Sequence, residues 1–94
     1  MDAPTFEWDP AKAAANLKKH RVSFEEAVSV FQDALAVVHP DPNHSGPESR
    51  AILLGHSARR RLLLVAFTDR QGRIRLISAR KLTRRERLDY EENR

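Results

Sequence analysis

The segment from Ile74 to Tyr90 constrains the fold most, because it predicts a strand that runs directly into a helix. Residues 74–79 alternate in hydrophobicity, as a half-buried strand does. Thr83 and Glu86 then have the spacing of a capping box at a helix start. Clustered cations at such a junction predict a surface for a polyanion. The basic residues of this unit are Arg75, Arg80, Lys81, Arg84, Arg85 and Arg87.

The whole chain, residues 1–94, predicts a single α+β domain with the element order β-α-α-β-β-β-β-α. Short loops between successive strands favour an antiparallel sheet, with the two early helices on one face and a third helix at the C-terminus. The proline-rich segment 40–47 and the segment 69–73 are predicted to be loops. The predicted strands cover 5–8, 34–39, 50–55, 62–68 and 74–79, and the predicted helices cover 11–20, the stretch from Ser23 to about Asp33, and the stretch from Thr83 onward.

Charge is divided unevenly along the chain. Residues 1–49 hold four Lys or Arg against eight Asp or Glu, whereas residues 50–94 hold thirteen against five. This asymmetry predicts a nucleic-acid surface or an acidic protein partner, although solvated surface charge would look the same. Cysteine is absent, which excludes disulfides and thiolate zinc sites. The sequence shows no membrane span and no signal peptide, so we expect a cytoplasmic protein.

Two separated blocks of sequence resemble the BrnT toxins, a family also labelled DUF497. The first block is the Trp-Asp-Pro to Lys-His region, and the second is the Ile-Ser-Ala-Arg region. Together they span roughly residues 6–90. The matching positions are Phe6 to Pro10, Lys12, Asn16, Lys19, His20, Val22 to Ala27, Phe31, Asp33, Arg50, Gly55, Arg75, Ile77 to Arg80, Glu86 and Tyr90.

The resemblance implies a RelE-like ribonuclease fold and an RNA endonuclease from a type II toxin–antitoxin system. It also implies a BrnA-like antitoxin with a ribbon-helix-helix domain, through which alone the pair would contact operator DNA. One position departs from the family, because Arg21 stands where a glycine usually follows Lys-His. Glycine permits a left-handed helix stop. Arg21 must therefore either accept backbone strain there or end the helix in another way.

Cleavage of RNA through its own 2′-hydroxyl needs a proton acceptor, a proton donor and cations at the phosphate. Arg80 precedes a helix N-terminus and is our foremost candidate to clamp a phosphate, with an ion pair to Glu86 as the alternative. His20 is a candidate acid or base, or simply a cation at a helix C-terminus. Arg50 could share the phosphate or be a solvated strand-end charge.

Two residues of the C-terminal helix complete the predicted catalytic set. Glu86 is first a capping residue and second a possible base. Tyr90 could close the site or stack on a base, and it could equally pack under the sheet. The predicted RNA-binding cations are Lys12, Lys19, Lys81, Arg84 and Arg85.

Neither a metal nor another cofactor is predicted, since the histidines lack metal-ligand spacing. His39, His44 and His56 lie in or beside predicted loops and are expected to be solvated. Because the sequence has no clearly paired acid and base, a non-catalytic module that binds RNA or an antitoxin is the alternative function. A DNA-binding regulator is disfavoured, because the basic helix is terminal and follows a strand.

Overall fold

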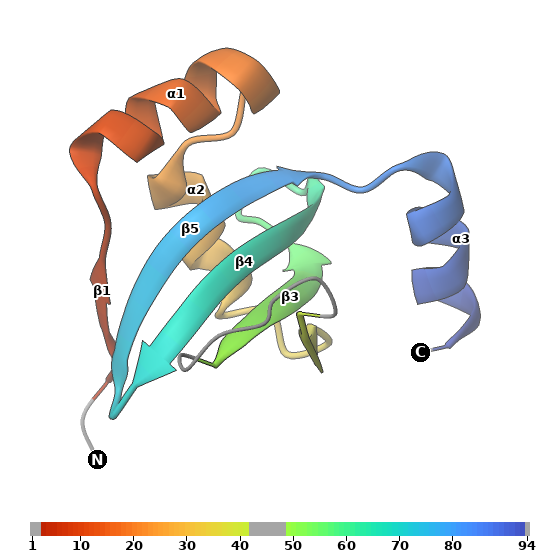
Figure 1. Ribbon diagram of the computed structural model, residues 1–94. Coiled ribbons are helices and arrows are strands. Elements are labelled where there is room, and N and C mark those ends of the chain that lie inside the picture. Colours follow the sequence, from red (N-terminus) through yellow and green to blue (C-terminus); the bar gives the residue numbers. More distant parts are fainter. Residues whose placement is uncertain (1–2, 42–48, 94) are drawn as a thin grey trace.

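The computed structural model describes residues 3–41 and 49–93. The element order β-α-α-β-β-β-β-α is confirmed (Figure 1). The predicted loop 40–47 and the prediction for His44 lie almost wholly outside the described residues. The strands are β1 (Thr5–Glu7), β2 (Val37–Pro40), β3 (Arg50–His56), β4 (Leu62–Arg70) and β5 (Arg73–Lys81), and the helices are α1 (Pro10–His20), α2 (Phe24–Val30) and α3 (Arg84–Glu92).

The five strands form one mixed sheet in the order β1-β5-β4-β3-β2. Strands β2 to β5 are antiparallel neighbours, as predicted. The predicted antiparallel sheet does not extend to β1, which runs parallel to β5 with Glu7 opposite Arg75. A short loop forces antiparallel pairing only on two strands that it connects directly. Two helices separate β1 from β2, so β1 is free to join the far edge of the sheet.

One face of the sheet forms the core with α1 and α2, as predicted, while α3 lies over the opposite face (Figure 1). Alternation along the strands divides the two faces. In β4, Leu63 and Val65 are buried in the core, whereas Leu64 faces α3. The core consists of Val22, Phe24, Ala27, Val30, Leu53, Leu63, Val65, Phe67, Ile74, Leu76 and Ala79.

A β-bulge in β5 keeps both ends of that strand in register with the core. Ala66 pairs with Ser78 and Phe67 pairs with Leu76, so Ile77 is the extra residue. An extra residue reverses the alternation of faces. Leu76 and Ala79, three positions apart, therefore both reach the core, and the side chain that follows, Arg80, faces the opposite side.

The predicted helix starts are confirmed, and α1 ends in a strained residue. Asp9 Oδ1 accepts a hydrogen bond from the Ala11 N–H at 2.8 Å. At the other end Arg21 has φ 60 and donates its N–H to the Leu17 carbonyl at 2.9 Å. A left-handed conformation costs a non-glycine residue about 1–2 kcal/mol. Arg21 thus ends the helix as a glycine would, with the strain that the sequence predicts.

The segment between α2 and β2 differs from the prediction. Helix α2 ends at Val30, and β2 begins at Val37 instead of Ala34. The cause is the Asp33 carboxylate, which accepts N–H bonds from Leu35 at 3.0 Å and His56 at 2.7 Å. These bonds hold the intervening residues in turns, which an apolar run in the sequence does not reveal.

Gly55 permits this close approach of Asp33 to β3. A Cβ atom at Gly55 would lie 2.9 Å from Asp33 Oδ2 and 2.8 Å from Ala36 Cβ. No real side chain tolerates both contacts without a shift of the turn. Glycine is therefore required here by space and not by its backbone angles.

The β4–β5 hairpin is tighter than predicted. Its turn contains only Gln71 at φ 56 and Gly72 at φ 87, which is the two-residue geometry that suits strand twist. The strands accordingly extend to Arg70 and Arg73, inside the predicted loop 69–73. No helix in 3–41 or 49–93 is long and apolar enough to cross a bilayer.

Asn16 fastens α1 to the edge of β5. Its Nδ2 donates to the carbonyls of Ala79 at 2.8 Å and Val22 at 2.9 Å, and its Oδ1 accepts from the Ala79 N–H at 3.1 Å. Strand β1 pairs only with residues 73–75 of β5, so Ala79 lies beyond it. The buried amide supplies the donor and acceptor that a neighbouring strand would supply.

We predict that Asn16→Asp destabilises the protein by about 2–3 kcal/mol, because a carboxylate cannot donate to the two carbonyls and repels them. Urea denaturation at pH 7 measures the change. Asn93→Asp is the matched control, since the exposed Asn93 donates one bond to the Asp89 carbonyl at 2.8 Å and should lose far less stability. Equal losses for the two variants would show that Asn16 does not hold the edge.

Candidate functional site

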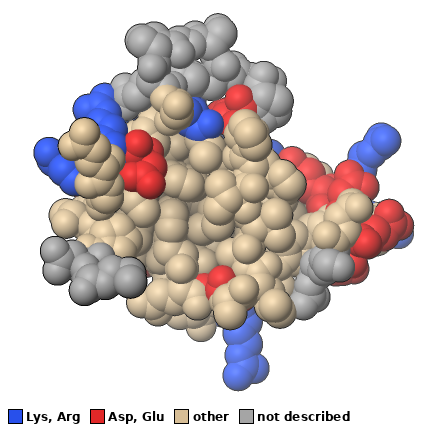
Figure 2. All heavy atoms as spheres, turned by 90° about the horizontal axis from the view of Figure 1, so that it is seen from below, with Lys and Arg blue, Asp and Glu red and all other residues tan. Residues whose placement is uncertain are grey.

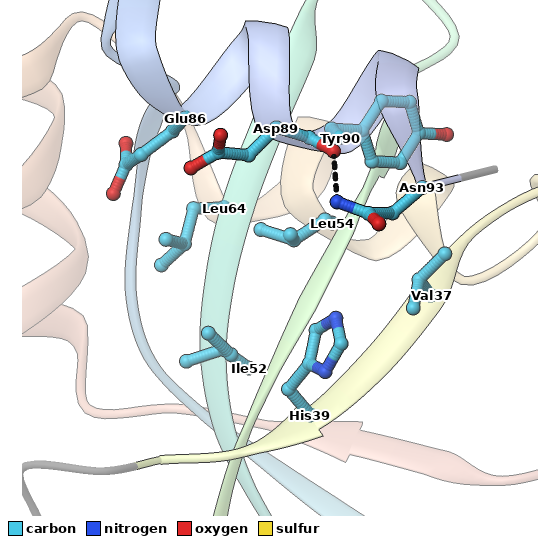
Figure 3. A pocket seen from close by; sticks show the side chains of 9 residues that line it. All are labelled: Val37, His39, Ile52, Leu54, Leu64, Glu86, Asp89, Tyr90 and Asn93. Atoms are coloured by element: carbon cyan, nitrogen blue, oxygen red, sulfur yellow. Dashed lines mark hydrogen bonds between the residues drawn. The ribbon is translucent and has the colours of Figure 1, made fainter.

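A groove of about 330 Å³ lies between α3 and the sheet face opposite the core (Figure 3). Its floor is apolar, and α3 supplies most of its polar rim. His39, on β2, points into the groove from the opposite side (Figure 3). The lining residues are Val37, His39, Ile52, Leu54, Leu64, Glu86, Asp89, Tyr90 and Asn93. An apolar floor with a polar rim suits the faces and edges of nucleobases.

Arg80 and Glu86 meet at this rim in a two-pronged ion pair. Arg80 Nη1 donates to Glu86 Oε1 at 2.8 Å, and Nη2 donates to Oε2 at 2.9 Å. Glu86 Oε1 also accepts from the Thr83 N–H at 2.9 Å and completes the predicted capping box. The alternative that the sequence left open for Arg80, a partner in Glu86, is therefore present.

This pair changes the acidity of both groups. The Arg80 guanidinium is the main reason that the pKa of Glu86 falls from 4.5 to about 2, with a further contribution from the Thr83 N–H. The Glu86 carboxylate in turn raises the pKa of Arg80. A carboxylate this acidic is a poor proton acceptor. Glu86 can act as a base only after Arg80 has left it.

Tyr90 contacts both the groove and the body of the protein. It is 5% exposed, and its hydroxyl donates to the Leu35 carbonyl at 3.3 Å. Its ring lies edge-on to His56, with centroids 6.3 Å apart. The ring of Tyr90 is thus packed, and the same residue also lines the groove.

The structure does not gather the whole predicted catalytic set. Arg80 and Arg50 face the same side of the sheet, but Arg50 lies four residues along β3 from the row that contains Arg80, or about 13 Å. Arg50 Nε lies 3.7 Å from Asp41 Oδ2. His20 ends α1, one turn beyond Asn16; among the described residues it forms no ion pair with Glu86, and it does not line the groove.

The predicted RNA-binding cations divide between two regions. Lys12 and Lys19 are exposed on α1, and Arg84 and Arg85 are exposed in the first turn of α3. Lys81 lines a second hollow, of about 340 Å³, on the other flank of α3. The hollow is lined by His56, Arg60, Arg61, Leu62, Lys81, Leu82, Arg87 and Glu91.

The arginines at 59–61 and 84–87 stand out in the sequence as possible contacts for an RNA backbone or as solvated charges, but the sequence does not show that some of them meet in one hollow. Arg60 and Arg61 belong to a turn between β3 and β4, and Arg87 belongs to α3. Their sequence signal was the run of arginines, but a run does not show which of them face one another. His56, predicted to be solvated, is half exposed here and lies 3.8 Å from Asp33 Oδ2 through Nδ1.

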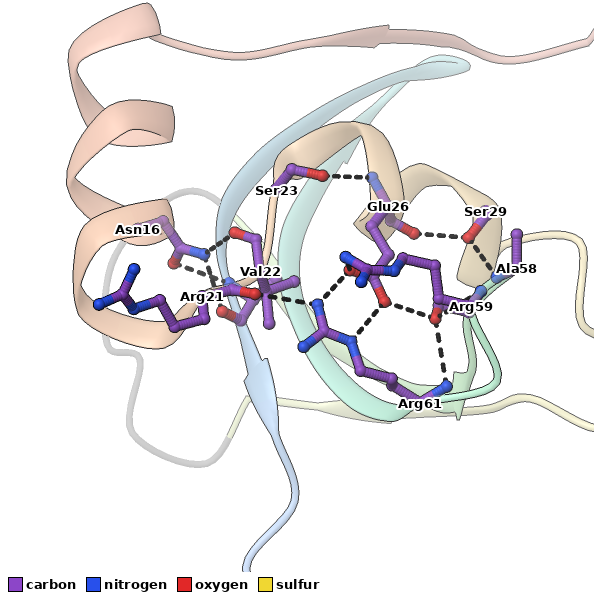
Figure 4. A network of polar contacts seen from close by, with 11 residues as sticks. Asn16, Arg21, Val22, Ser23, Glu26, Ser29, Ala58, Arg59 and Arg61 are labelled. Atoms are coloured by element: carbon purple, nitrogen blue, oxygen red, sulfur yellow. Dashed lines mark hydrogen bonds and ion pairs between the residues drawn. The ribbon is translucent and has the colours of Figure 1, made fainter.

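Beside the hollow lies a buried polar network that the sequence did not reveal (Figure 4). The Ser23 hydroxyl accepts from the Glu26 N–H at 3.0 Å, as predicted for a capping box. The Glu26 carboxylate instead turns inward, where it accepts from the Ser57 hydroxyl at 2.6 Å and from Arg61 Nε at 2.9 Å. A second, very short bond joins Arg61 Nη2 to Glu26. The hydrogen bond from Arg61 is the main reason that the pKa of Glu26 is lowered.

Charge is unevenly spread over the surface as well. The face seen in Figure 2 has a largely uncharged centre, with Lys and Arg at its margins and Asp and Glu gathered at the side where α3 lies. Within the described ranges, no group of three or more His, Asp or Glu side chains is arranged to hold a metal ion.

Comparison with known proteins places this geometry in a family. Residues 8–86 match the family described as the ribonuclease toxin BrnT of type II toxin–antitoxin systems. The crystal structure of the Brucella abortus ribonuclease toxin BrnT superposes with a TM-score of 0.67 at 20% identity, covering 87% of this chain and 100% of that one. No curated protein matches the chain. This chain therefore belongs to the BrnT family of ribonuclease toxins.

Proposed function

We propose that this protein is a metal-independent endoribonuclease that cleaves RNA through the substrate's own 2′-hydroxyl, at the groove beneath α3. Family membership supports an RNA substrate and an antitoxin partner. The observation that carries the proposed site is the Arg80–Glu86 pair at the groove rim. A guanidinium that grips a carboxylate with two bonds presents the same two donors to a phosphate.

The exchange of partners at Arg80 would start the reaction. A scissile phosphate takes the place of the Glu86 carboxylate, and Arg80 then stabilises the negative charge that grows on the phosphorus oxygens. Without its cation, the pKa of Glu86 rises back toward its ordinary range, and the carboxylate becomes a better acceptor for the 2′-hydroxyl proton. Substrate binding thus turns the capping residue into the base.

The second proton transfer of the reaction delivers a proton to the leaving 5′-oxygen. His39 lines the groove and points into it (Figure 3), whereas His20, the last residue of α1, is not among the residues that line it. We therefore propose His39 in place of His20 as the general acid. By register its Cα lies three strands and two residues from that of Arg80, about 16 Å, so the two side chains would reach toward an RNA strand bound between them. Attack by the 2′-oxygen forms a 2′,3′-cyclic phosphate, and the bond to the 5′-oxygen breaks to leave a 5′-hydroxyl.

The partner side of the proposal follows from the family. We propose that a BrnA-like antitoxin with a ribbon-helix-helix domain inhibits the enzyme by covering this groove, and that operator DNA is bound only through that antitoxin. We further propose that cleavage of RNA in the cytoplasm inhibits translation.

Incubation of the purified protein with end-labelled RNA in EDTA tests the activity. We expect fragments with 2′,3′-cyclic phosphate ends, and no cleavage of a 2′-O-methyl RNA of the same sequence. Cleavage of the methylated strand, or a strict need for a divalent metal, would overturn the mechanism. RNA that is bound but never cut would favour the non-catalytic binding module.

We predict that Arg80→Ala lowers the cleavage rate at saturating RNA by about 10²–10³-fold, because it removes the donors that face the phosphate. Arg80→Lys keeps the positive charge but loses the two-pronged donor, so its cleavage rate should lie between those of the unmodified protein and Arg80→Ala. The control is Arg73→Ala, which removes an exposed arginine bonded to Glu7 at 2.7 Å at the other end of β5. A rate for Arg80→Ala equal to that of the control would exclude Arg80 from the site.

The acidity of Glu86 gives a prediction for stability. A folded-state pKa of about 2 lies below the ordinary 4.5, so the ionised pair stabilises the fold above pH 4.5 and stops doing so as the pH falls toward 2. We predict that Glu86→Gln costs about 0.5–1 kcal/mol at pH 7, since the pair is partly exposed. The difference from the unmodified protein should shrink across pH 4.5 to 2. A constant difference in urea denaturation over that range would contradict the pairing.

A further inference from the structure

The hollow on the second flank of α3 differs from the groove because most of its cations form no ion pair with a carboxylate in the part of the chain that the structure describes. In the groove, Arg80 is already bonded to Glu86. In the hollow, Arg61 is bonded to Glu26, but Arg60, Lys81 and Arg87 take part in no ion pair among the described residues. Only Glu91 brings negative charge to the lining. Three unmatched cations around one concavity favour an anionic ligand.

The backbone adds an independent observation. Arg60 has φ 64 and lies in a tight turn, in which its N–H donates to the Ser57 carbonyl at 2.8 Å. Arg21, at the end of α1, has φ 60. Glycine would adopt both conformations without strain. The turns themselves therefore do not explain why arginine occupies these positions.

The two strained arginines lie at the same corner of the molecule. Arg61 Nη2 donates to the Arg21 carbonyl at 2.9 Å, and so joins the end of α1 to the turn that carries Arg60 (Figure 4). The Glu26 carboxylate holds Arg61 in that position. Backbone strain that is kept at two positions connected by one side chain is typical of a functional surface.

The hollow and the groove are also close to each other. They lie on the two flanks of α3, which contributes Glu86 and Asp89 to the groove and Arg87 and Glu91 to the hollow. Arg80 turns to Glu86 at the groove, and Lys81 lines the hollow. One polymer that crosses the N-terminal turn of α3 can therefore touch both sites. A polyanion with regularly spaced charges meets this requirement.

We propose that the hollow binds a backbone phosphate of the RNA next to the cleaved bond, with Arg60, Lys81 and Arg87 as its cationic contacts. Leu62 and Leu82 offer an apolar wall to the adjoining ribose or base. This inference rests on the proposed function in taking RNA as the ligand, but it does not depend on the cleavage mechanism. The hollow extends the RNA site past α3 and fixes the direction in which the strand leaves the groove.

The test uses the double variant Arg60→Gly with Arg87→Ala, and measures binding of a 2′-O-methyl RNA by fluorescence anisotropy from 50 to 300 mM salt. We expect weaker binding at low salt. The slope of log Kd against log salt should fall by about 0.7, the value for one lost phosphate contact on a single strand. Because the probe cannot be cleaved, a failure of the cleavage mechanism leaves this measurement intact.

Melting temperatures distinguish a loss of RNA contacts from damage to the fold. Arg60→Gly alone relieves the left-handed residue, so it should raise the melting temperature while it weakens RNA binding. The matched control is Gln71→Gly in the β4–β5 turn, where the φ of 56 is relieved without loss of charge. That control should raise the melting temperature and leave both the Kd and the salt slope unchanged.

Two results would overturn the inference. One is a salt slope for the double variant equal to that of the unmodified protein. The other is competition by polyglutamate that equals competition by RNA of the same charge, because the hollow would then recognise carboxylates of an acidic protein segment.

Discussion

The buried carboxylate of Glu26 is the contact on which the basic end of the molecule depends. Its side chain is only 4% exposed, and a buried charge is tolerated only when it is paired and hydrogen-bonded. Ser57 and Arg61 supply those bonds from the turn that follows β3. Through Arg61 the same carboxylate also holds the end of α1. One residue of α2 therefore joins the end of α1, at Arg21, to the turn that carries Arg60.

The arginines of the sheet and those of the hollow have different electrostatic roles. On the sheet, Arg73 and Arg75 share Glu7, whose pKa they lower, and Arg80 holds Glu86. Arg80 is thus neutralised in the free protein, and Arg73 and Arg75 share one carboxylate, so these three cations add less long-range attraction than unpaired cations would. The cations of the hollow are not neutralised in this way, so they dominate the first encounter with a polyanion.

Local patterns in the sequence predicted the local structure. The features that the sequence did not predict depend on contacts between residues far apart in the chain. Caps such as Asp9 and Thr83 act over two or three residues, so their helices begin where predicted. The parallel pairing of β1 and the inward turn of Glu26 depend on partners more than thirty residues away. Arg80 and Glu86 were found because six positions separate them, whereas His39 needed the fold to bring it to the groove.

Arg80 can bind a phosphate even though Glu86 neutralises it in the free protein. A partly exposed ion pair contributes about 1 kcal/mol or less, so a phosphate that offers the same two acceptors displaces the carboxylate at little cost. Until then Glu86 keeps the guanidinium in one orientation at the groove, which reduces the entropy lost when the substrate binds. Because Glu86 also caps α3, the helix that forms the groove rim and the cation that faces the substrate are held by a single carboxylate.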